Sequence, residues 1–358
     1  MVPKDQPVLI VGGGIVGCST AYYLSKAGFT NVIVIEAVDV AHAASGRAGG
    51  FLARDWCNNQ PTQALAIRGF EIYSELTAEL GVDIGYRHVN TLSLNLGSGD
   101  GRGDATAPGW VDGQVSNVSV LGTKGTTAQV HPGLATKALL SKAQEKGVKL
   151  LRSRVIAANY SEKKINSLLL ESGETVPGET VILTMGPWTG FGLEWFGKSK
   201  IISGERAHSI VLKPEPGRVD DTALFLSLPA GETEVYPRPD GTVYVCGQQD
   251  EEPLPADPAL VVSNPVMCAD LLQAAYRVSS SLSGLKEEST SACYLPTVKD
   301  HKPLVGLVPG FTSLYIAAGH FCWGILQGPA TGEALAQLIL SGEAPESIQR
   351  LDPARIIK

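Results

Sequence analysis

The sequence of 358 residues lacks several features that define common protein classes. Its six cysteines form no C-x-x-C pair and its six histidines form no cluster, so neither a disulfide framework nor a metal site is expected. No basic stretch accompanies the net charge of -7, which disfavours binding to nucleic acid. No apolar run approaches the roughly 20 residues of a membrane span. No repeat with a period of about 20 to 50 residues indicates a solenoid or a propeller.

From the position of its first strand, we expect no leader segment in the given sequence. The first core strand begins within about seven residues of the start, which leaves no room for a signal peptide or a transit sequence. The scattered cysteines suit reduced thiols in the cytosol. We therefore expect a cytoplasmic protein, and peripheral association with an organelle stays open.

What the sequence does have is a glycine-rich stretch near its start, "PVLIVGGGIVG". The run Val8–Val11 is apolar without alternation, as in a buried parallel strand. Apolar residues then recur at helical spacing over 15–27, and Gly28 follows where a helix would stop. A second apolar strand over 31–35 ends at Glu36. The pattern predicts a strand, a tight turn, a helix and a second strand.

The three glycines Gly12, Gly14 and Gly17 have the G-x-G-x-x-G spacing of a dinucleotide-binding turn. Gly12 would permit the tight turn, Gly14 would let a pyrophosphate approach the main chain, and Gly17 would let the helix pack on the strand. Glu36 would accept hydrogen bonds from the ribose hydroxyls. The alternative is an ordinary glycine-rich turn, which any α/β protein can contain. The two strands, the helix and the acidic residue at the expected spacing favour dinucleotide binding over this alternative. This element alone does not separate FAD from NAD.

Two kinds of secondary-structure pattern alternate along the rest of the chain. Helix and strand patterns return over 127–190, whereas 200–250 holds short β runs separated by proline, glycine and aspartate. A helix over about 266–282 and a final strand and helix follow. We predict an α/β fold in which a Rossmann-like domain with a central parallel sheet is discontinuous in sequence and carries an inserted antiparallel-sheet domain. The predicted boundaries are 1–82, 128–199 and 294–358 for the nucleotide domain, and 83–127 and 200–293 for the β-rich substrate domain.

Four blocks in order carry a family resemblance: "VLIVGGGIVG", "SGRAGGFLA", "VILTMGPWTG" and "YIAAGHFCWGILQGPATGEALAQLI". Together they resemble the D-amino-acid oxidase, glycine oxidase and monomeric sarcosine oxidase superfamily of FAD proteins. The phrases "TTAQVHP", "AHSIVL" and "EVYPRPDGTVYVCG" are most similar to its fungal and plant branch, whose chemistry is poorly defined. The resemblance covers nearly the whole chain and implies FAD. The lack of a second G-x-G-x-x-G agrees, because disulfide-reductase-like flavoproteins that dock NADPH carry one.

The resemblance also implies where FAD is held. A helix beginning near Gly324 would aim its N–H groups at flavin N1 and the C2 carbonyl, where negative charge accumulates on reduction. The implied cofactor-binding residues are Gly12, Gly13, Gly14, Ile15, Val16, Gly17, Glu36, Ala37, Ser45, Gly46, Arg47, Gly49, Gly50, Val155, Gly186, Trp188, Gly319, His320, Trp323, Gly324, Ile325 and Leu326.

Members of this superfamily oxidise the C–N bond of a small amine or amino acid by hydride transfer to flavin N5, and pass the electrons to oxygen or another acceptor. Such sites usually hold a cation for the substrate carboxylate, ideally a bidentate arginine. The candidates are Arg206 and Arg238 on the inserted sheet, with Arg47 and Arg54 near the flavin and Arg206 as the favourite. For each of them the bland alternative is a structural or solvated ion pair. His320 completes the catalytic candidates, more as a flavin neighbour than as a proton shuttle.

The sequence leaves several alternatives open. No lysine occurs over 241–247, where the sarcosine oxidase branch places a lysine that promotes reaction with oxygen, so a dehydrogenase with another acceptor stays possible. Cys293 lies near where sarcosine oxidase bonds its flavin, although an unattached thiol is the favoured state. A flavin-binding regulatory protein that recruits a protein partner, or an NAD-linked dehydrogenase, are further alternatives. Substrate selectivity is expected in the inserted sheet and in the loops around 50–60 and 220–235.

Overall fold

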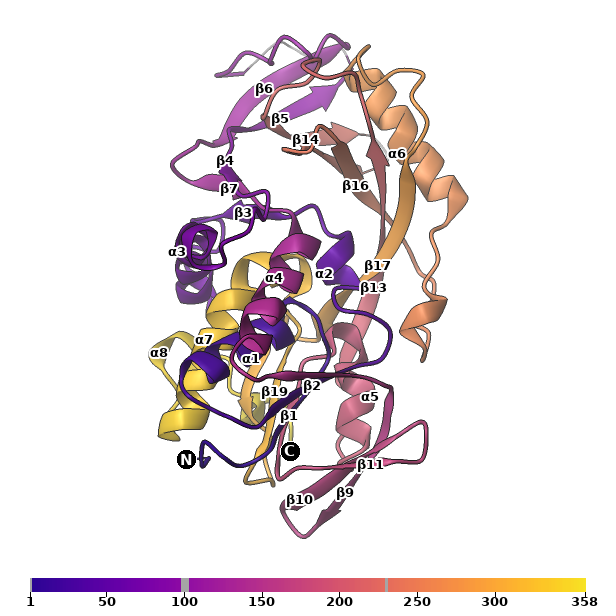
Figure 1. The fold of residues 1–358 in the computed structure, drawn as a ribbon. Helices are drawn as coiled ribbons and strands as arrows, with labels where there is room; N and C mark the ends of the chain where they lie inside the picture. The colour runs from indigo at the N-terminus through magenta and orange to yellow at the C-terminus, as the bar shows by residue number, and fades with distance from the viewer. Residues whose placement is uncertain (1, 98–102, 229–230) are drawn as a thin grey trace.

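The computed structural model describes residues 2–97, 103–228 and 231–358. Its centre is a six-stranded sheet in the order β18-β19-β12-β1-β2-β8 (Figure 1). All its pairings are parallel except β18 with β19, and this confirms the expected parallel core. The strands are β1 (Val8–Val11), β2 (Val32–Glu36), β8 (Lys149–Arg152), β12 (Thr180–Leu183), β18 (Leu304–Leu307) and β19 (Leu314–Ala318).

Helices pack together on one side of this sheet. Helix α1 contacts both α4 and α7, and α3 packs on α7. A Cβ on Gly328 of α7 would lie 2.9 Å from the Ile15 side chain of α1, so glycine permits this close crossing. The helices of this layer are α1 (Ile15–Lys26), α3 (Gln63–Glu79), α4 (Pro132–Gln144), α7 (Gly324–Ser341) and the short α8 (Glu346–Gln349). Helix α1 stops as expected, with Gly28 at a φ of +90°.

The second large sheet has seven strands in the order β17-β13-β16-β15-β14-β5-β6, and it lies at the other end of the elongated molecule (Figure 1). Its pairings are antiparallel except that of β14 with β5. Helix α6 packs on one face and buries an apolar cluster that includes Leu271 and Val278. The strands are β5 (Thr91–Leu96), β6 (Val115–Gly122), β13 (Ile202–Leu212), β14 (Ala223–Leu228), β15 (Gly231–Pro237), β16 (Val243–Asp250) and β17 (Ser289–Val298).

Helix α6 (Pro265–Val278) ends four residues before the position that the sequence predicts. The chain is extended at Ser279, with φ of -151°, and the Ser279 hydroxyl donates a hydrogen bond to the Trp110 carbonyl at 2.6 Å. Leu282 is nonetheless fully buried in the same cluster as the helix. The sequence pattern therefore predicts a helix that is too long, because a non-helical turn after α6 places Leu282 in the core.

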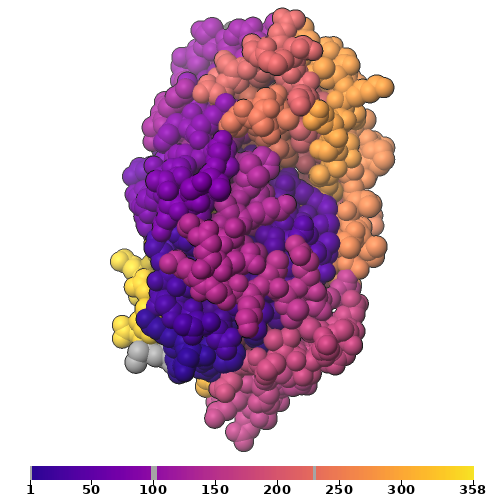
Figure 2. All heavy atoms as spheres, viewed as in Figure 1, coloured from indigo at the N-terminus to yellow at the C-terminus, as the bar shows by residue number. Residues whose placement is uncertain are grey.

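The remaining elements lie outside the two large sheets and include two three-stranded sheets, in the orders β11-β10-β9 and β3-β7-β4. Figure 2 shows the outline of one face, with α6 in orange at the upper right and indigo N-terminal residues in the lower half. These elements are β3 (Phe51–Ala53), β4 (Arg87–His88), β7 (Thr127–Gln129), β9 (Val155–Ser161), β10 (Lys164–Leu170), β11 (Thr175–Pro177), α2 (Ala44–Arg47), α5 (Thr189–Glu194), and the 3-10 turns η1 (Gly186–Trp188), η2 (Pro258–Leu260), η3 (Phe321–Trp323) and η4 (Pro353–Arg355). Within the described ranges, no helix combines the length and the apolar character needed to cross a membrane.

Candidate functional site

The turn between β1 and α1 packs backbone directly on backbone. Gly12 has a φ of +112°, and a Cβ there would lie 2.6 Å from the carbonyl oxygen of Thr184 at the end of β12. A Cβ on Gly17 would lie 2.0 Å from the carbonyl oxygen of Gly12. Both positions therefore require glycine. A Cβ on Gly14 would meet only the Ser45 hydroxyl, at 3.1 Å, so this position is less crowded by the protein itself.

Glu36 closes the same turn from the end of β2. Its Oε2 accepts a hydrogen bond from the Gly13 N–H at 2.6 Å, and its Oε1 accepts one from the Val38 N–H at 2.9 Å. Burial raises the pKa of this carboxyl, and the two backbone N–H donors oppose that rise. The carboxylate thus stands beside the glycine turn, where a ribose acceptor is expected from the sequence.

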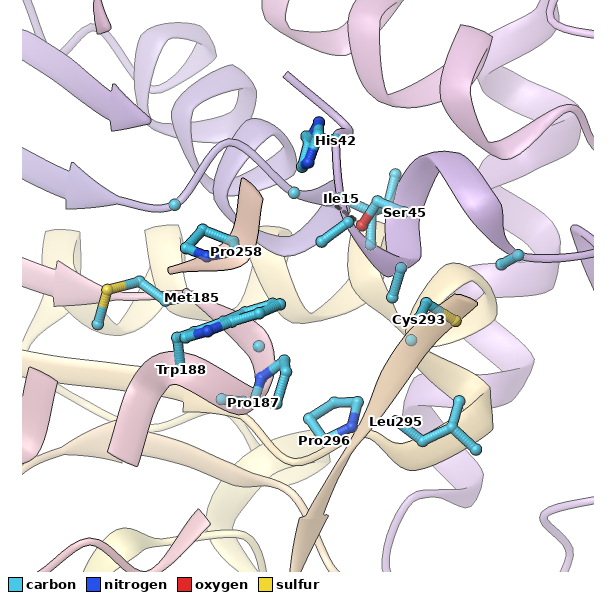
Figure 3. Close-up of a pocket in the computed structure, with 18 of the residues that line it drawn as sticks. Ile15, His42, Ser45, Met185, Pro187, Trp188, Pro258, Cys293, Leu295 and Pro296 are labelled. Carbon is cyan, nitrogen blue, oxygen red and sulfur yellow. Dashed lines mark hydrogen bonds between the residues drawn. The ribbon is translucent and has the colours of Figure 1, made fainter. Parts of the chain in front are cut away.

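Helix α2 connects the glycine turn to the seven-stranded sheet. The Ser45 hydroxyl accepts a hydrogen bond from the Ile15 N–H at 2.9 Å, as Figure 3 shows. The Arg47 guanidinium donates to the Ala292 carbonyl at 2.8 Å, and the Tyr244 hydroxyl donates to the Arg47 carbonyl at 2.7 Å. Arg47 is therefore a structural tie between α2 and the sheet, and its side chain is committed to a backbone carbonyl.

A cavity of about 960 Å³ starts at the glycine turn and reaches the seven-stranded sheet. The ends of β1, β2 and β12 form one end of it, and residues from β13, β15, β16 and β17 form the other. Figure 3 shows the Trp188 ring, Pro187 and Met185 on one side of this space, with Cys293 and Leu295 of β17 on another. The volume falls in the range of enclosed ligand sites. The residues that sequence analysis assigned to the cofactor and that line this cavity are Gly12, Gly13, Gly14, Ile15, Val16, Glu36, Ala37, Ser45, Gly49, Val155, Gly186, Trp188, His320, Gly324 and Ile325.

The other residues assigned to the cofactor lie behind this lining. Gly46 packs its backbone on Ala41, since a Cβ there would lie 2.0 Å from the Ala41 carbonyl oxygen. Gly319 has a φ of +89° and sets the direction of the chain into His320. The remaining members of this group are Gly17 and Arg47, described above, the buried Leu326, and Gly50 and Trp323, which line a second cavity.

His320 is buried between β19 and α7 and lines the cavity. Its Nε2 is 3.0 Å from the hydroxyl oxygen of Thr331. Burial lowers the pKa of His320 to about 4, so the imidazole is neutral at physiological pH. Cys293 also lines the cavity, and burial raises the pKa of its thiol to about 11. A protonated thiol is a weak nucleophile, and an unattached Cys293 stays a prediction from the sequence.

The structure does not bring the two favoured arginines into the cavity. The Arg206 guanidinium donates two hydrogen bonds of 2.6 Å to the carboxylate of Asp250 and one of 3.3 Å to the Val262 carbonyl. Arg238 stacks on the Tyr244 ring, with its guanidinium carbon 4.7 Å from the ring centroid, and donates to the Ala48 carbonyl at 3.1 Å. Arg206 thus forms a structural ion pair with a protein carboxylate, which is the alternative to substrate binding named above for each arginine. Arg154 is the one arginine or lysine among the described residues that line the cavity, and Asp257 pairs with it.

A second cavity, of about 510 Å³, adjoins the first beside the sheet, and we call it the side chamber. Aromatic rings form much of its wall. Phe51 stacks on Tyr236 with ring centroids 5.5 Å apart, and Trp56 lies 5.1 Å from both Phe51 and Phe225. Its described lining residues are Ala48, Gly49, Gly50, Phe51, Trp56, Ser93, Leu121, Phe225, Leu226, Ser227, Glu232, Glu234, Tyr236, Cys322, Trp323 and Ile325.

Glu234 is one of the site residues that sequence reasoning missed. It lines both cavities, and its Oε2 accepts hydrogen bonds from the Tyr236 hydroxyl at 2.6 Å and from the Cys246 thiol at 3.3 Å. Burial raises the pKa of its carboxyl. A signal was present, because Glu234 alternates with Tyr236 on one face of a strand in the 220–235 region where selectivity was expected.

Comparisons with known proteins agree with this geometry. A family model described as FAD dependent oxidoreductase (DAO) matches residues 7–338. The chain belongs to this family. The family is FAD-dependent, which decides between the two dinucleotides that the glycine-rich turn left open.

Individual relatives extend over the whole chain. A Schizosaccharomyces pombe protein whose name gives only the class oxidoreductase is 31% identical over 98% of both chains. The glycine oxidase of Bacillus licheniformis is 25% identical over 94% of both chains. The solved structure of glycine oxidase from Geobacillus kaustophilus superimposes with a TM-score of 0.83 at 20% identity, covering 99% of this chain and 100% of that chain. The last likeness confirms the predicted fold class.

Proposed function

We propose that this FAD-dependent oxidoreductase oxidises the C–N bond of a small amine. The observation that supports this most is that Gly12–Ile15 and His320–Ile325, near opposite ends of the chain, contribute to one cavity. The first segment has the geometry of a pyrophosphate turn, and the second begins helix α7. An extended dinucleotide would span the distance between them. The amine and amino-acid oxidases among its structural neighbours favour this substrate class over others.

The residues present fit FAD. The backbone N–H group of Gly14, just before α1, would face the pyrophosphate, and Glu36, which already accepts from the Gly13 N–H, would accept further hydrogen bonds from the ribose. Val155 would offer backbone to the adenine, and the residues from His320 to Ile325 would hold the isoalloxazine. When bound, FAD supplies the acceptor for the hydride that leaves the carbon beside the amine nitrogen.

The protein itself would stabilise negative charge in the cavity and exclude water from it. The first turn of α7 lines the cavity at Gly324 and Ile325 and has no side-chain cap, so its N–H groups would stabilise negative charge that develops there. Trp188, Tyr244 and Leu295 would keep water from the reacting carbon. His320 would orient the ring system as a neutral group, because its pKa of about 4 keeps it from carrying a proton at neutral pH.

A screen of the purified holoprotein tests this function. We expect a yellow protein whose oxidised-flavin absorption bleaches under anaerobic conditions with at least one member of a panel of D- and L-amino acids, N-methyl amino acids and polyamines. Bleaching by no amine would overturn the enzymatic proposal and favour the flavin-binding regulatory protein. A colourless protein that cannot be loaded with FAD would contradict the flavin site itself.

The electron acceptor is a second question for the same preparation. No lysine lines either cavity among the described residues, which favours a dehydrogenase with an acceptor other than oxygen. Re-oxidation after bleaching distinguishes the two: slow recovery in air and fast recovery with an artificial dye support the dehydrogenase, and fast recovery in air supports the oxidase. Cytoplasmic placement and the division of the chain into five domain segments stay predictions from the sequence.

A further inference from the structure

The side chamber has a composition that selects one chemical class of ligand. Its aromatic wall is formed by Phe51, Trp56, Phe225 and Tyr236, and the ring centroid of Trp323 lies 6.2 Å from that of Trp56. Aromatic rings attract a cation through the negative potential of their faces, and clusters of them bind alkylammonium groups. The wall is therefore suited to a positively charged, carbon-substituted nitrogen.

The charged groups of the side chamber have the complementary sign. Its described lining residues include two glutamates, Glu232 and Glu234, and neither an arginine, a lysine nor a histidine. Glu234 accepts its two hydrogen bonds on Oε2. Within the described part of the chain, Oε1 has no hydrogen-bond partner, so it is available to a ligand. A carboxylate in this position attracts an ammonium group and repels a substrate carboxylate.

Neither an arginine nor a lysine is among the described residues that line the side chamber, although the neighbouring Arg238 keeps a buried Nε without a hydrogen-bond partner. Arg206 is held by Asp250, and Arg47 and Arg238 donate to backbone carbonyls. Replacing these partners would leave Asp250 or the carbonyl groups unpaired, which is costly in a buried setting. An amino acid bound through its carboxylate therefore lacks the bidentate partner that such sites use.

We propose that the side chamber binds an alkylammonium group, so that the substrate carries a cationic nitrogen, held by Glu234 and the aromatic wall, in place of a carboxylate. The inference rests on the proposed function, because it takes the neighbouring cavity as the place of amine oxidation. In that arrangement the bond to be oxidised belongs to a second, neutral nitrogen of the same molecule, and the cationic end orients it.

Binding of a probe that cannot be oxidised at an amine tests the inference without turnover. Tetramethylammonium ion has no nitrogen lone pair, and Trp56 and Trp323 in the chamber report its binding through their fluorescence. We expect a saturable fluorescence change in the holoprotein with tetramethylammonium chloride, and none with sodium acetate at equal ionic strength. Saturable binding of acetate without binding of tetramethylammonium would overturn the inference.

Two glutamate variants form a matched pair. Glu234→Gln should weaken tetramethylammonium binding at least tenfold, whereas Glu232→Gln, at an exposed position of the same chamber, should change it less than threefold. Equal affinity in wild type and Glu234→Gln overturns the role of this carboxylate. FAD content and thermal unfolding of each variant establish that the fold is retained. If Glu234→Gln does not fold, Trp56→Leu compared with Trp56→Phe provides the second test, with loss of binding expected for leucine alone.

The two failures are distinguishable. Failure of the proposed function shows as flavin that no amine bleaches, and this leaves the binding titration unaffected. Failure of the inference alone shows as bleaching by amino acids in a protein to which tetramethylammonium does not bind.

Discussion

His320 illustrates how a single buried side chain couples the site to stability. The folded protein holds its imidazole neutral, with a pKa of about 4, whereas the unfolded chain protonates it near the ordinary value of 6.5. Between these values the unfolded state binds more protons, so the free energy of unfolding falls as pH falls from about 6.5 to about 4. The full loss is on the order of 3 kcal/mol.

We predict that His320→Gln removes this part of the pH dependence. Glutamine does not titrate and can bond to Thr331, so the slope of unfolding free energy against pH should flatten between about 6.5 and 4. Chemical denaturation at a series of pH values measures it. His88→Gln, at an exposed position, is the control and should leave the slope unchanged. An unchanged slope in His320→Gln would contradict the neutral buried imidazole.

At the residue scale, sequence reasoning works where local geometry decides. Gly12, Gly17 and Glu36 were predictable because the tight turn and the neighbouring strand end impose their spacing within one short segment. Arg206 was not predictable, because Asp250, which pairs with it, lies on another strand and only the folded sheet brings the two together. A charge read from sequence has no known partner until the register of the sheet is fixed.

The join of β1 with α1 gives a prediction at the scale of one element. A Cβ on Gly17 would lie 2.0 Å from the Gly12 carbonyl oxygen and 2.7 Å from the Thr184 hydroxyl, so Gly17→Ala must push the helix off the strand. We expect a loss of about 3 kcal/mol or more in unfolding free energy, even without FAD, because overpacking of backbone against backbone cannot relax by a rotamer change. Thermal and urea unfolding of the apoprotein measure this loss.

Two other glycines give the controls for that experiment. Gly109→Ala adds a methyl group with nothing within 4 Å, so its stability should match wild type. Gly14→Ala meets only the Ser45 hydroxyl and should fold as an apoprotein while binding FAD more weakly. A Gly17→Ala protein as stable as Gly109→Ala would show that the turn tolerates a side chain.

The sequence predicts whether a segment is a helix or a strand better than it predicts where the element ends. The parallel strands and α1 follow from apolar periodicity and from the stop at Gly28. The end of α6 could not be predicted in this way. The helix stops where the Ser279 hydroxyl bonds to the distant Trp110 carbonyl, whereas the apolar pattern continues to Leu282. The side chamber escaped prediction for a similar reason. Its rings come from β3, β14 and β15 and from the segments around 56 and 323, and no single stretch of sequence contains them.

At the scale of the whole molecule, the cofactor should act as part of the fold. FAD that fills the large cavity binds the folded state alone, and at 100 times its Kd it adds about 2.7 kcal/mol to the unfolding free energy. We expect FAD at this ratio to raise the melting temperature of the apoprotein by about 4 °C. NAD at the same concentration is the control and should give no shift. A rise with NAD and none with FAD would contradict the assignment of the cavity.

The pairing of β5 with β14, and of β1 with β12 and β12 with β19, has a consequence for biosynthesis. The ribosome adds residue 11 to the chain long before residue 325, yet both residues line the same cavity. The nascent chain therefore carries an incomplete nucleotide site until the segment around residue 325 has been made, and the aromatic and apolar walls of this site remain solvent-exposed during that interval. Chaperone engagement should consequently persist until helix α7 leaves the exit tunnel, and the yellow coenzyme should be captured only after that point.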